Sequence, residues 1–214
     1  VLVGSMLLAL LLYLPGFHLI ANAANPALVA AQQRTPVIVE TDPTTCAVQF
    51  DPVGTARFDT ACDIAKSLLV GRGIAYSTVD NGNPTSTAIH VGELILAVPG
   101  GADSSDADLE RLKATVGTHL DATLARAGYP EAADPDRIDY ATLVAVLLLF
   151  VVAATALYGP QAAALVEMFP TRVRYTAMSL PYHVGTGWVG GFLPVTSFAL
   201  AAITGDIYAS LWYP

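Results

Sequence analysis

Charge is nearly absent from the two ends of this sequence. Residues 1–33 carry no charged side chain, and the segment 34–139 carries the whole net charge of −8. With 13% charged and 54% hydrophobic residues, the chain departs from the composition of an average soluble domain. We therefore expect a membrane protein with one acidic, water-soluble segment between two apolar ends. The charged residues outside 34–139 are Glu167, Arg172, Arg174 and Asp206.

Clusters of basic residues and common catalytic motifs are also lacking. Ten Lys and Arg oppose 18 Asp and Glu without forming a basic patch, which excludes nucleic acid as a partner. There is no Ser-His-Asp set, phosphate loop or haem motif, and His90 and His119 are isolated, so we expect neither an enzyme nor a cofactor or metal site. Four acids lack the spacing of a calcium loop and are predicted to cap a helix: Asp103, Asp106, Asp108 and Glu110.

Only two cysteines are present, Cys46 and Cys62. Two free thiols and a metal-binding pair are the alternatives to a disulfide, and the pair lacks His partners at ligand spacing. We favour a disulfide, which in the chain-entropy model contributes about 3 kcal/mol for a loop of this length. A disulfide requires an oxidising, extracytoplasmic compartment.

The long apolar runs predict membrane spans. Residues 1–23 are apolar enough to cross a bilayer core of about 30 Å. A secretory signal peptide is the alternative, because an A-x-A-like site follows the run. The run begins without a basic region, which favours a spanning helix, and we expect the sequence to be part of a longer protein.

Two further spans are predicted in the second half of the chain. Residues 140–168 form an apolar run without charge before Glu167, and residues 175–205 form a run rich in Gly and Pro, followed by an external loop over 206–214. The third run contains a G-x-x-x-G pair that favours close helix packing, although a lipid-facing helix that tolerates glycine is the alternative. The predicted packing residues are Gly187, Gly190, Gly191 and Pro194.

The middle segment, 24–139, is long enough for a small α+β domain. Residues 36–41 and 87–98 are rich in β-branched residues, which predicts strands. Apolar residues recur at helical spacing over 104–129, which predicts a helix capped by Ser105, and a shorter helix is expected within 58–73.

The short loop 169–174 predicts the orientation of the chain. It carries Arg172 and Arg174, so it should face the cytoplasm by the positive-inside rule. Residues 24–139 then lie outside, in agreement with the predicted disulfide, and the chain is a multi-pass protein of the plasma membrane. Pro170 ends the preceding helix and turns Glu167 back toward the arginines, where an ion pair would lower the cost of charge at the membrane edge. A Glu167 that is simply solvated is the alternative.

Several motifs in the apolar flanks resemble the metabolite:proton symporter branch of the major facilitator superfamily. They occur in the order of that family: Tyr158-Gly159-Pro160, Glu167 to Tyr175, Ser179 to Tyr182, and Gly190-Gly191 to Pro194. The residues ANPAL at 24–28, which close the first span, also fit. The resemblance implies that the three spans correspond to the ninth, tenth and eleventh helices of a twelve-helix transporter. Family members have a short external connection where this chain has the segment 24–139.

The resemblance also implies a function for the charged loop. Glu167, Arg172 and Arg174 would form a cytoplasmic charge network that loosens as the two halves of the transporter rock, and Arg174 is the closer match to the paired arginine of the family. The cargo would be a small organic solute such as an osmolyte, amino-acid derivative or organic acid, taken up with a proton. The expected partners are this solute, membrane lipid and the remaining helices.

Polar groups within the spans are candidates to face the solute. They are Tyr158, Gln161, Tyr182 and His183, with Thr186 and Trp188 beside them. Hydrogen bonding between helices or anchoring at the membrane interface is the alternative for each. The competing function for the whole chain is a membrane-anchored extracellular binding or sensing domain, which would need neither the G-x-x-x-G pair nor the charged loop.

Overall fold

The structure, a computed structural model, describes residues 2–213 and contains two compact units. A helical unit comprises the residues up to Pro26 together with Asp134–Leu193, and a mixed unit comprises Ala27–Ala133 together with Pro194–Tyr213. Three helical segments are long and apolar enough to cross a membrane: Val3–Ala24, Tyr140–Met168 and Arg174–Thr204. The predicted combination of apolar helices and a small sheet is therefore present.

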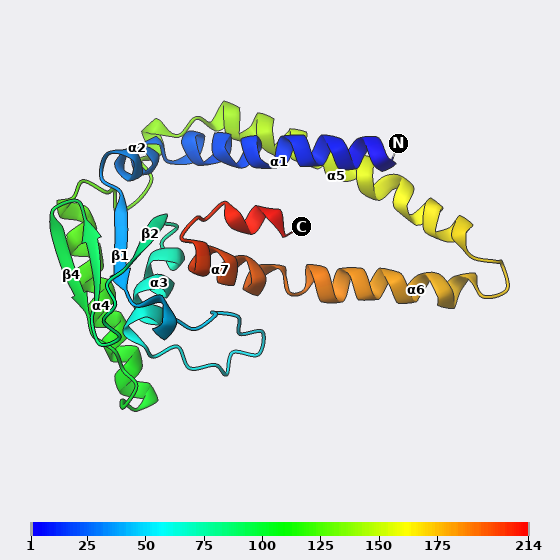
Figure 1. The fold of residues 1–214 in the computed structure, drawn as a ribbon. Helices are drawn as coiled ribbons and strands as arrows, with labels where there is room; N and C mark the ends of the chain where they lie inside the picture. Colours follow the sequence, from blue (N-terminus) through cyan, green and yellow to red (C-terminus); the bar gives the residue numbers. More distant parts are fainter. Residues whose placement is uncertain (1, 214) are drawn as a thin grey trace. The chain divides into compact units, whose positions relative to one another are not determined.

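The helical unit is built on α1 (Leu2–Ala24) and α5 (Tyr140–Met168), which lie side by side (Figure 1). The ends of the two helices are joined because the Asp139 amide donates to the Ala23 carbonyl at 2.9 Å. Asp139 also caps α5, since its carboxylate accepts hydrogen bonds from the amide and the hydroxyl of Thr142.

Close packing of α1 on α5 centres on Gly16 and Phe150. A Cβ at Gly16 would lie 2.4 Å from Cζ of Phe150, so any side chain at this position would have to displace the ring. Tyr13 and Phe17 flank the same ring, with centroid distances of 6.0 and 5.4 Å. Sequence pattern did not predict this contact, because a single glycine has no partner at G-x-x-x-G spacing.

The segment predicted as a third span is divided in the structure. It begins with α6 (Arg174–Val184), continues as the π-helix η3 (Gly185–Gly190), and resumes after two residues as α7 (Leu193–Thr204). Glycine loses no side-chain packing when the backbone departs from α geometry, which explains why the irregular turn falls on GTGWVG. Residues from Pro194 onward belong to the mixed unit and not to the helical unit.

The mixed unit contains a four-stranded sheet. The strand order is β2-β1-β3-β4, with β1 and β2 parallel and the other pairs antiparallel. The run 87–98 forms two strands because the chain reverses at Gly92, which has a φ of +61°. Strand β2 was not predicted. The strands are β1 (Val37–Thr41), β2 (Tyr76–Asp80), β3 (Thr87–Val91) and β4 (Leu94–Val98).

Helical elements complete this unit. They are α2 (Pro26–Arg34), α3 (Ala61–Gly71) and α4 (Asp106–Arg126), with the single turns η1 (Pro43–Thr45) and η4 (Ala209–Trp212); a further single turn, η2 (Pro135–Arg137), lies in the helical unit. The predicted cap of α4 is confirmed, because Ser105 Oγ accepts from the Asp108 amide.

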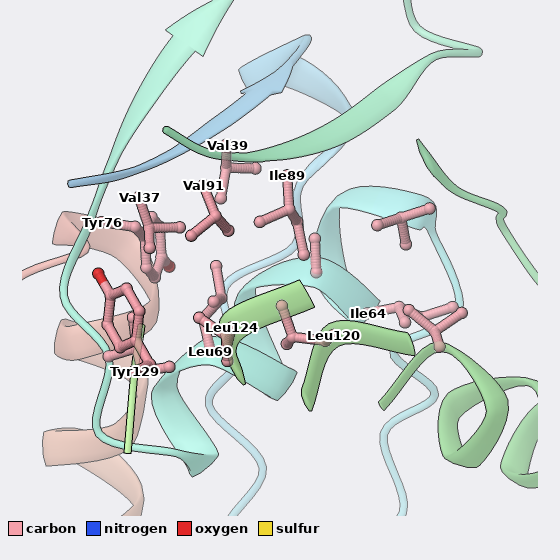
Figure 2. Packing of buried hydrophobic residues seen from close by; sticks show 14 of the residues in the cluster. Val37, Val39, Ile64, Leu69, Tyr76, Ile89, Val91, Leu120, Leu124 and Tyr129 are labelled. Atoms are coloured by element: carbon pink, nitrogen blue, oxygen red, sulfur yellow. The ribbon is translucent and has the colours of Figure 1, made fainter. Parts of the chain in front are cut away.

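The core lies between the sheet and the two helices α3 and α4 (Figure 2). Alternate residues of β1 and β3 point inward, and Val39 and Ile89 are fully buried. They meet Leu69 from α3 and Leu120 from α4, which are also fully buried. The sheet thus has one apolar, covered face, as its alternating pattern requires.

Candidate functional site

The charged turn connects α5 to α6. Helix α5 ends at Met168, Phe169 is its extended C-cap, and Pro170 prevents the helix from continuing. Arg174, the first residue of α6, donates a hydrogen bond from Nε to the Phe169 carbonyl at 3.1 Å. A guanidinium at this place satisfies a carbonyl that the helix leaves free and interacts favourably with the negative end of the helix dipole. Arg174 therefore closes the turn.

Glu167 lies in the last turn of α5 and is exposed to solvent. Between residues 2 and 213 the structure describes no ion pair from Glu167 to Arg172 or Arg174. The predicted carboxylate–guanidinium pairing thus stays a prediction. The guanidinium of Arg174 instead contacts the backbone at the end of the same helix.

The candidate solute-facing residues fall into two separate pairs. Tyr158 and Gln161 lie on α5, and Tyr182 and His183 lie on α6. The rings of Tyr182 and His183 meet edge to face with centroids 5.7 Å apart. Within the described part of the chain, no hydrogen bond or ring contact links one pair to the other. These four residues do not enclose a binding site by themselves.

The π-helix η3 is the most irregular part of the apolar helices. A Cβ at Gly191 would lie 2.1 Å from the Gly187 carbonyl oxygen, so the exit from the π turn requires glycine at this position. Nothing lies within 4 Å of a Cβ built at Gly187 or Gly190. Gly191 thus meets a local backbone requirement in this structure, and its predicted role in packing between helices stays a prediction. Packing at Gly187 and Gly190 stays a prediction.

A π turn in an apolar helix is a candidate place for function. Such turns interrupt the regular hydrogen-bond ladder and occur frequently at functional sites, and irregular backbone at membrane depth needs protein or water beside it. Trp188 within η3 is 68% exposed, and its ring meets that of Phe192 at 90°. The only sequence signal for this feature is the density of glycine around it.

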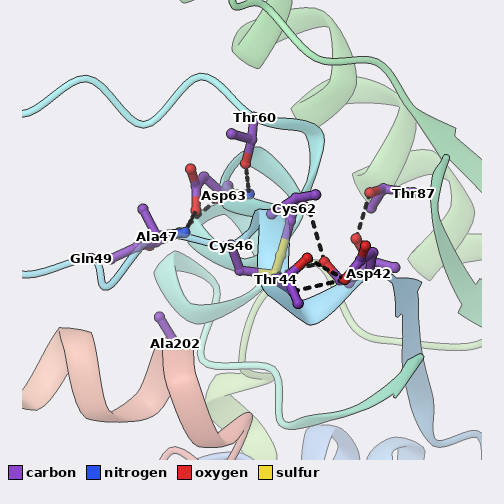
Figure 3. Close-up of a disulfide and its surroundings, with 12 residues drawn as sticks. Asp42, Thr44, Cys46, Ala47, Gln49, Thr60, Cys62, Asp63, Thr87 and Ala202 are labelled. Carbon is purple, nitrogen blue, oxygen red and sulfur yellow. Dashed lines mark hydrogen bonds between the residues drawn. A yellow bond between two sulfur atoms is a disulfide. The ribbon is translucent and has the colours of Figure 1, made fainter. Parts of the chain in front are cut away.

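The predicted disulfide between Cys46 and Cys62 is present in the mixed unit, with a Cα–Cα distance of 5.3 Å. Cys62 lies in the first turn of α3 and is fully buried (Figure 3). The neighbouring Asp63 is also buried; its carboxylate accepts from the Ala47 amide and its carbonyl accepts from the Gln49 side chain, both at 2.8 Å. The cross-link and these bonds attach the start of the loop 46–60 to α3.

Two buried polar side chains beside this loop were not singled out in the sequence. Oε1 of Gln49 is buried without a hydrogen-bond partner, and Lys66 on α3 is 7% exposed. Burial lowers the pKa of the Lys66 ammonium, while the charge of Asp63 acts in the opposite direction. Among the described residues, no group of three or more His, Cys, Asp or Glu side chains is arranged to hold a metal ion.

Ion pairs join elements of the mixed unit and were also missed. Arg72 follows α3 and makes a two-point contact with Asp121 of α4, at 2.5 and 2.9 Å. His90 is not isolated, because its Nε2 lies 2.8 Å from Oε2 of Glu40 on the neighbouring strand, outside hydrogen-bond geometry. Neither the packing of α3 on α4 nor the register of the strands can be read from a single sequence, so neither contact has a signal there.

Comparisons of this chain with protein-family models, curated proteins and solved structures found no match. The features that bear on the function are the apolar helices, the turn closed by Arg174, the π-helix and the disulfide-linked domain.

Proposed function

We propose that this chain is part of a proton-coupled secondary transporter of the major facilitator superfamily, from its metabolite:proton symporter branch. It carries a small organic solute by alternating access. In this proposal Tyr140–Met168 and Arg174–Thr204 are consecutive spans, Val3–Ala24 is the span before them, and further helices complete the transporter.

The observation that carries the proposal is the turn between α5 and α6. Simple membrane anchors need no charge at such a turn, yet residues 167–174 place Glu167, Arg172 and Arg174 between two long apolar helices. Arg174 holds the end of α5 through the Phe169 carbonyl. A charge that contacts a helix end is suited to a connection that forms in one state and opens in another.

The orientation of the chain follows from two independent arguments. The disulfide between Cys46 and Cys62 requires an oxidising compartment, so residues 24–139 are extracytoplasmic. The two arginines of the short turn are expected on the cytoplasmic side. Both arguments support the proposed orientation of a multi-pass membrane protein, with residues 24–139 outside the cytoplasm.

Uptake by the complete protein tests the proposal. Candidate osmolytes, amino-acid derivatives and organic acids are added in turn to the medium outside the proteoliposomes, with and without an inward proton gradient. We expect accumulation of at least one class that collapses when a protonophore removes the gradient. Absence of gradient-dependent uptake for every class, with the protein folded and inserted, would contradict symport.

A membrane-anchored extracellular binding domain is the second candidate. This candidate is favoured by the mixed unit, which has its own hydrophobic core and its own disulfide. The same vesicles separate the two functions, since an anchored binding domain holds solute at equilibrium whether or not a gradient exists. It would also saturate near one solute per protein, whereas a carrier accumulates many.

A further inference from the structure

The end of α7 is attached to the edge strand β2 of the mixed unit. The Tyr76 amide donates to the Gly205 carbonyl at 2.8 Å, and the Tyr76 hydroxyl donates to the Ala202 carbonyl at 2.6 Å. Tyr76 is 7% exposed, and burial raises the pKa of its phenol well above the usual range. The hydroxyl therefore stays protonated and remains a donor at any physiological pH.

The backbone conformation of Gly205 and its lack of a side chain allow this contact. It ends α7 with a φ of +75°, and its own amide donates to the Ala201 carbonyl at 2.8 Å. A Cβ at Gly205 would lie 2.0 Å from the Tyr76 carbonyl oxygen, which cannot retreat without moving the strand. The last turns of α7 are buried through small side chains, Ala199, Ala201 and Ala202. The helix end and the strand thus fit only while position 205 is glycine.

The length of the third apolar segment leaves residues available for this contact. Arg174–Thr204 has 31 residues, which as a helix would extend over roughly 46 Å, against about 30 Å for the hydrocarbon core. About 20 residues suffice to span. Arg174–Leu193 provides them within the helical unit, and the residues that pack on the mixed unit begin at Pro194. The residues beyond the length needed to span, from Pro194 onward, are therefore the ones that pack on the domain.

We propose that Tyr76 and Gly205 fix the extracytoplasmic domain to the last part of the third apolar segment, Pro194–Thr204, so that the domain and these residues move as one body. The proposal rests on the spanning role given to Arg174–Thr204 in the proposed function. A movement of Pro194–Thr204 during alternating access would move the domain as well. A ligand of the domain that prefers one position would then shift the transporter by the same free energy, because coupling is reciprocal.

Distance measurements between spin labels test the attachment without any transport assay. Labels are placed at His119→Cys on α4 and Ile203→Cys on α7, two exposed positions, in the 214-residue chain in detergent micelles with the native disulfide intact. We expect one narrow distance distribution. Gly205→Ala should broaden it into a wide distribution, because the new Cβ meets the Tyr76 backbone.

Gly73→Ala is the matched control. Gly73 has a φ of +66°, close to that of Gly205, but nothing lies within 4 Å of its Cβ position. This variant suffers the same backbone strain and should keep the narrow distribution. A broad distribution in the parent chain, or equal broadening by both variants, would overturn the proposal.

A milder pair of variants covers the case in which Gly205→Ala fails to fold. Tyr76→Phe and Tyr129→Phe each remove one buried hydroxyl that donates to a carbonyl at 2.6 Å, from Tyr76 to Ala202 and from Tyr129 to Thr35. In hydrogen exchange, Tyr76→Phe should accelerate the amides of residues 203–206 about three- to tenfold. Tyr129→Phe should leave them unchanged. Equal exchange at 203–206 in both variants would contradict the attachment, and neither readout depends on solute transport.

Discussion

Phe150 of α5 lies directly over Gly16 of α1, so close that a Cβ on the glycine would overlap the ring at 2.4 Å. Because Gly16 has no side chain, the two apolar helices can approach closely with the Phe150 ring between them. In lipid the hydrophobic effect does not drive helices together. Their association depends instead on van der Waals packing, which small residues allow at close range. Gly16 is therefore a position where the pairing of α1 with α5 depends on a single residue.

Gly16→Val should weaken this pairing. The added side chain has to displace Phe150, and overpacking of this kind costs about 1–3 kcal/mol. A lower thermal unfolding midpoint in detergent micelles is the expected result. Gly4→Val on the same helix is the control, because nothing lies within 4 Å of its Cβ position. Equal losses in the two variants would show that glycine matters only for helix propensity.

Loss of the disulfide should destabilise the mixed unit. Cys46→Ser with Cys62→Ser removes a cross-link that closes a loop with a sequence separation of 16, which in the chain-entropy model is worth about 3 kcal/mol. Urea unfolding followed by circular dichroism should show this loss, and reduction of the parent protein should reproduce it. Recovery of both cysteines as alkylated thiols from non-reduced protein would show that the bond does not form.

Acid should remove the stabilisation that comes from Arg72 and Asp121. The hydrogen bonds and the charge of Arg72 hold the pKa of Asp121 below its usual value. Because the folded pKa is the lower one, this contribution is complete above about pH 4, the unfolded value, and is lost as pH falls through the folded pKa. Asp121→Asn should therefore lower the free energy of unfolding at pH 7 and show little difference from the parent near pH 2.

The matched control for this titration is Glu131→Gln, which alters an exposed carboxylate for which the structure describes no ion pair. Urea unfolding of the parent and both variants is measured from pH 7 to 2. A constant difference between Asp121→Asn and the parent at every pH would refute the ionic origin of the effect.

Replacement of the charges at the turn should lower uptake by the complete transporter. Arg174→Gln removes the guanidinium that donates to Phe169, and Glu167→Gln removes the carboxylate at the end of α5. We expect each to reduce uptake by about tenfold, the effect of roughly 1.4 kcal/mol on one state. Arg172→Gln should have a smaller effect. Normal uptake in both of the first two variants, at equal levels in the membrane, would refute the gating role.

Labelling from the two sides of the membrane should establish the orientation. Glu131→Cys and Thr171→Cys each introduce one thiol at an exposed position beside the native disulfide. A membrane-impermeant maleimide should label Glu131→Cys on intact cells, and Thr171→Cys only after permeabilisation. The reverse pattern would place the disulfide-linked domain in the cytoplasm and contradict the proposed topology.

Local patterns predicted much of the fold. The helix 104–129 and the strand 36–41 correspond to α4 and β1, because their apolar residues recur with the period of the element. The disulfide was inferred from the presence of only two cysteines. Strand β2 escaped prediction because it is mostly exposed and lacks an alternating buried face, and its partner β1 is distant in sequence. A parallel pairing has no local turn signal.

Local sequence patterns predicted only part of the candidate site. Pro170 predicted the end of α5, since proline prevents continuation of a helix. The bond from Arg174 to the Phe169 carbonyl depends on the path of the chain after that proline. Glycine permits the π-helix at Gly185–Gly190 but equally permits a regular α-helix, so its presence in the sequence does not predict the π turn.

Sequence alone determined the separation of apolar and acidic segments, the end of α5 before Pro170, and the two cysteines, because each is a property of composition or of near neighbours. Tertiary structure decided which glycine lies under an aromatic ring, which carbonyl meets Arg174, and which strand receives the end of α7. Gly16 and Phe150, like Tyr76 and Gly205, are more than a hundred residues apart. Contacts at such separation arise only when the chain has folded, because no periodic pattern connects their positions.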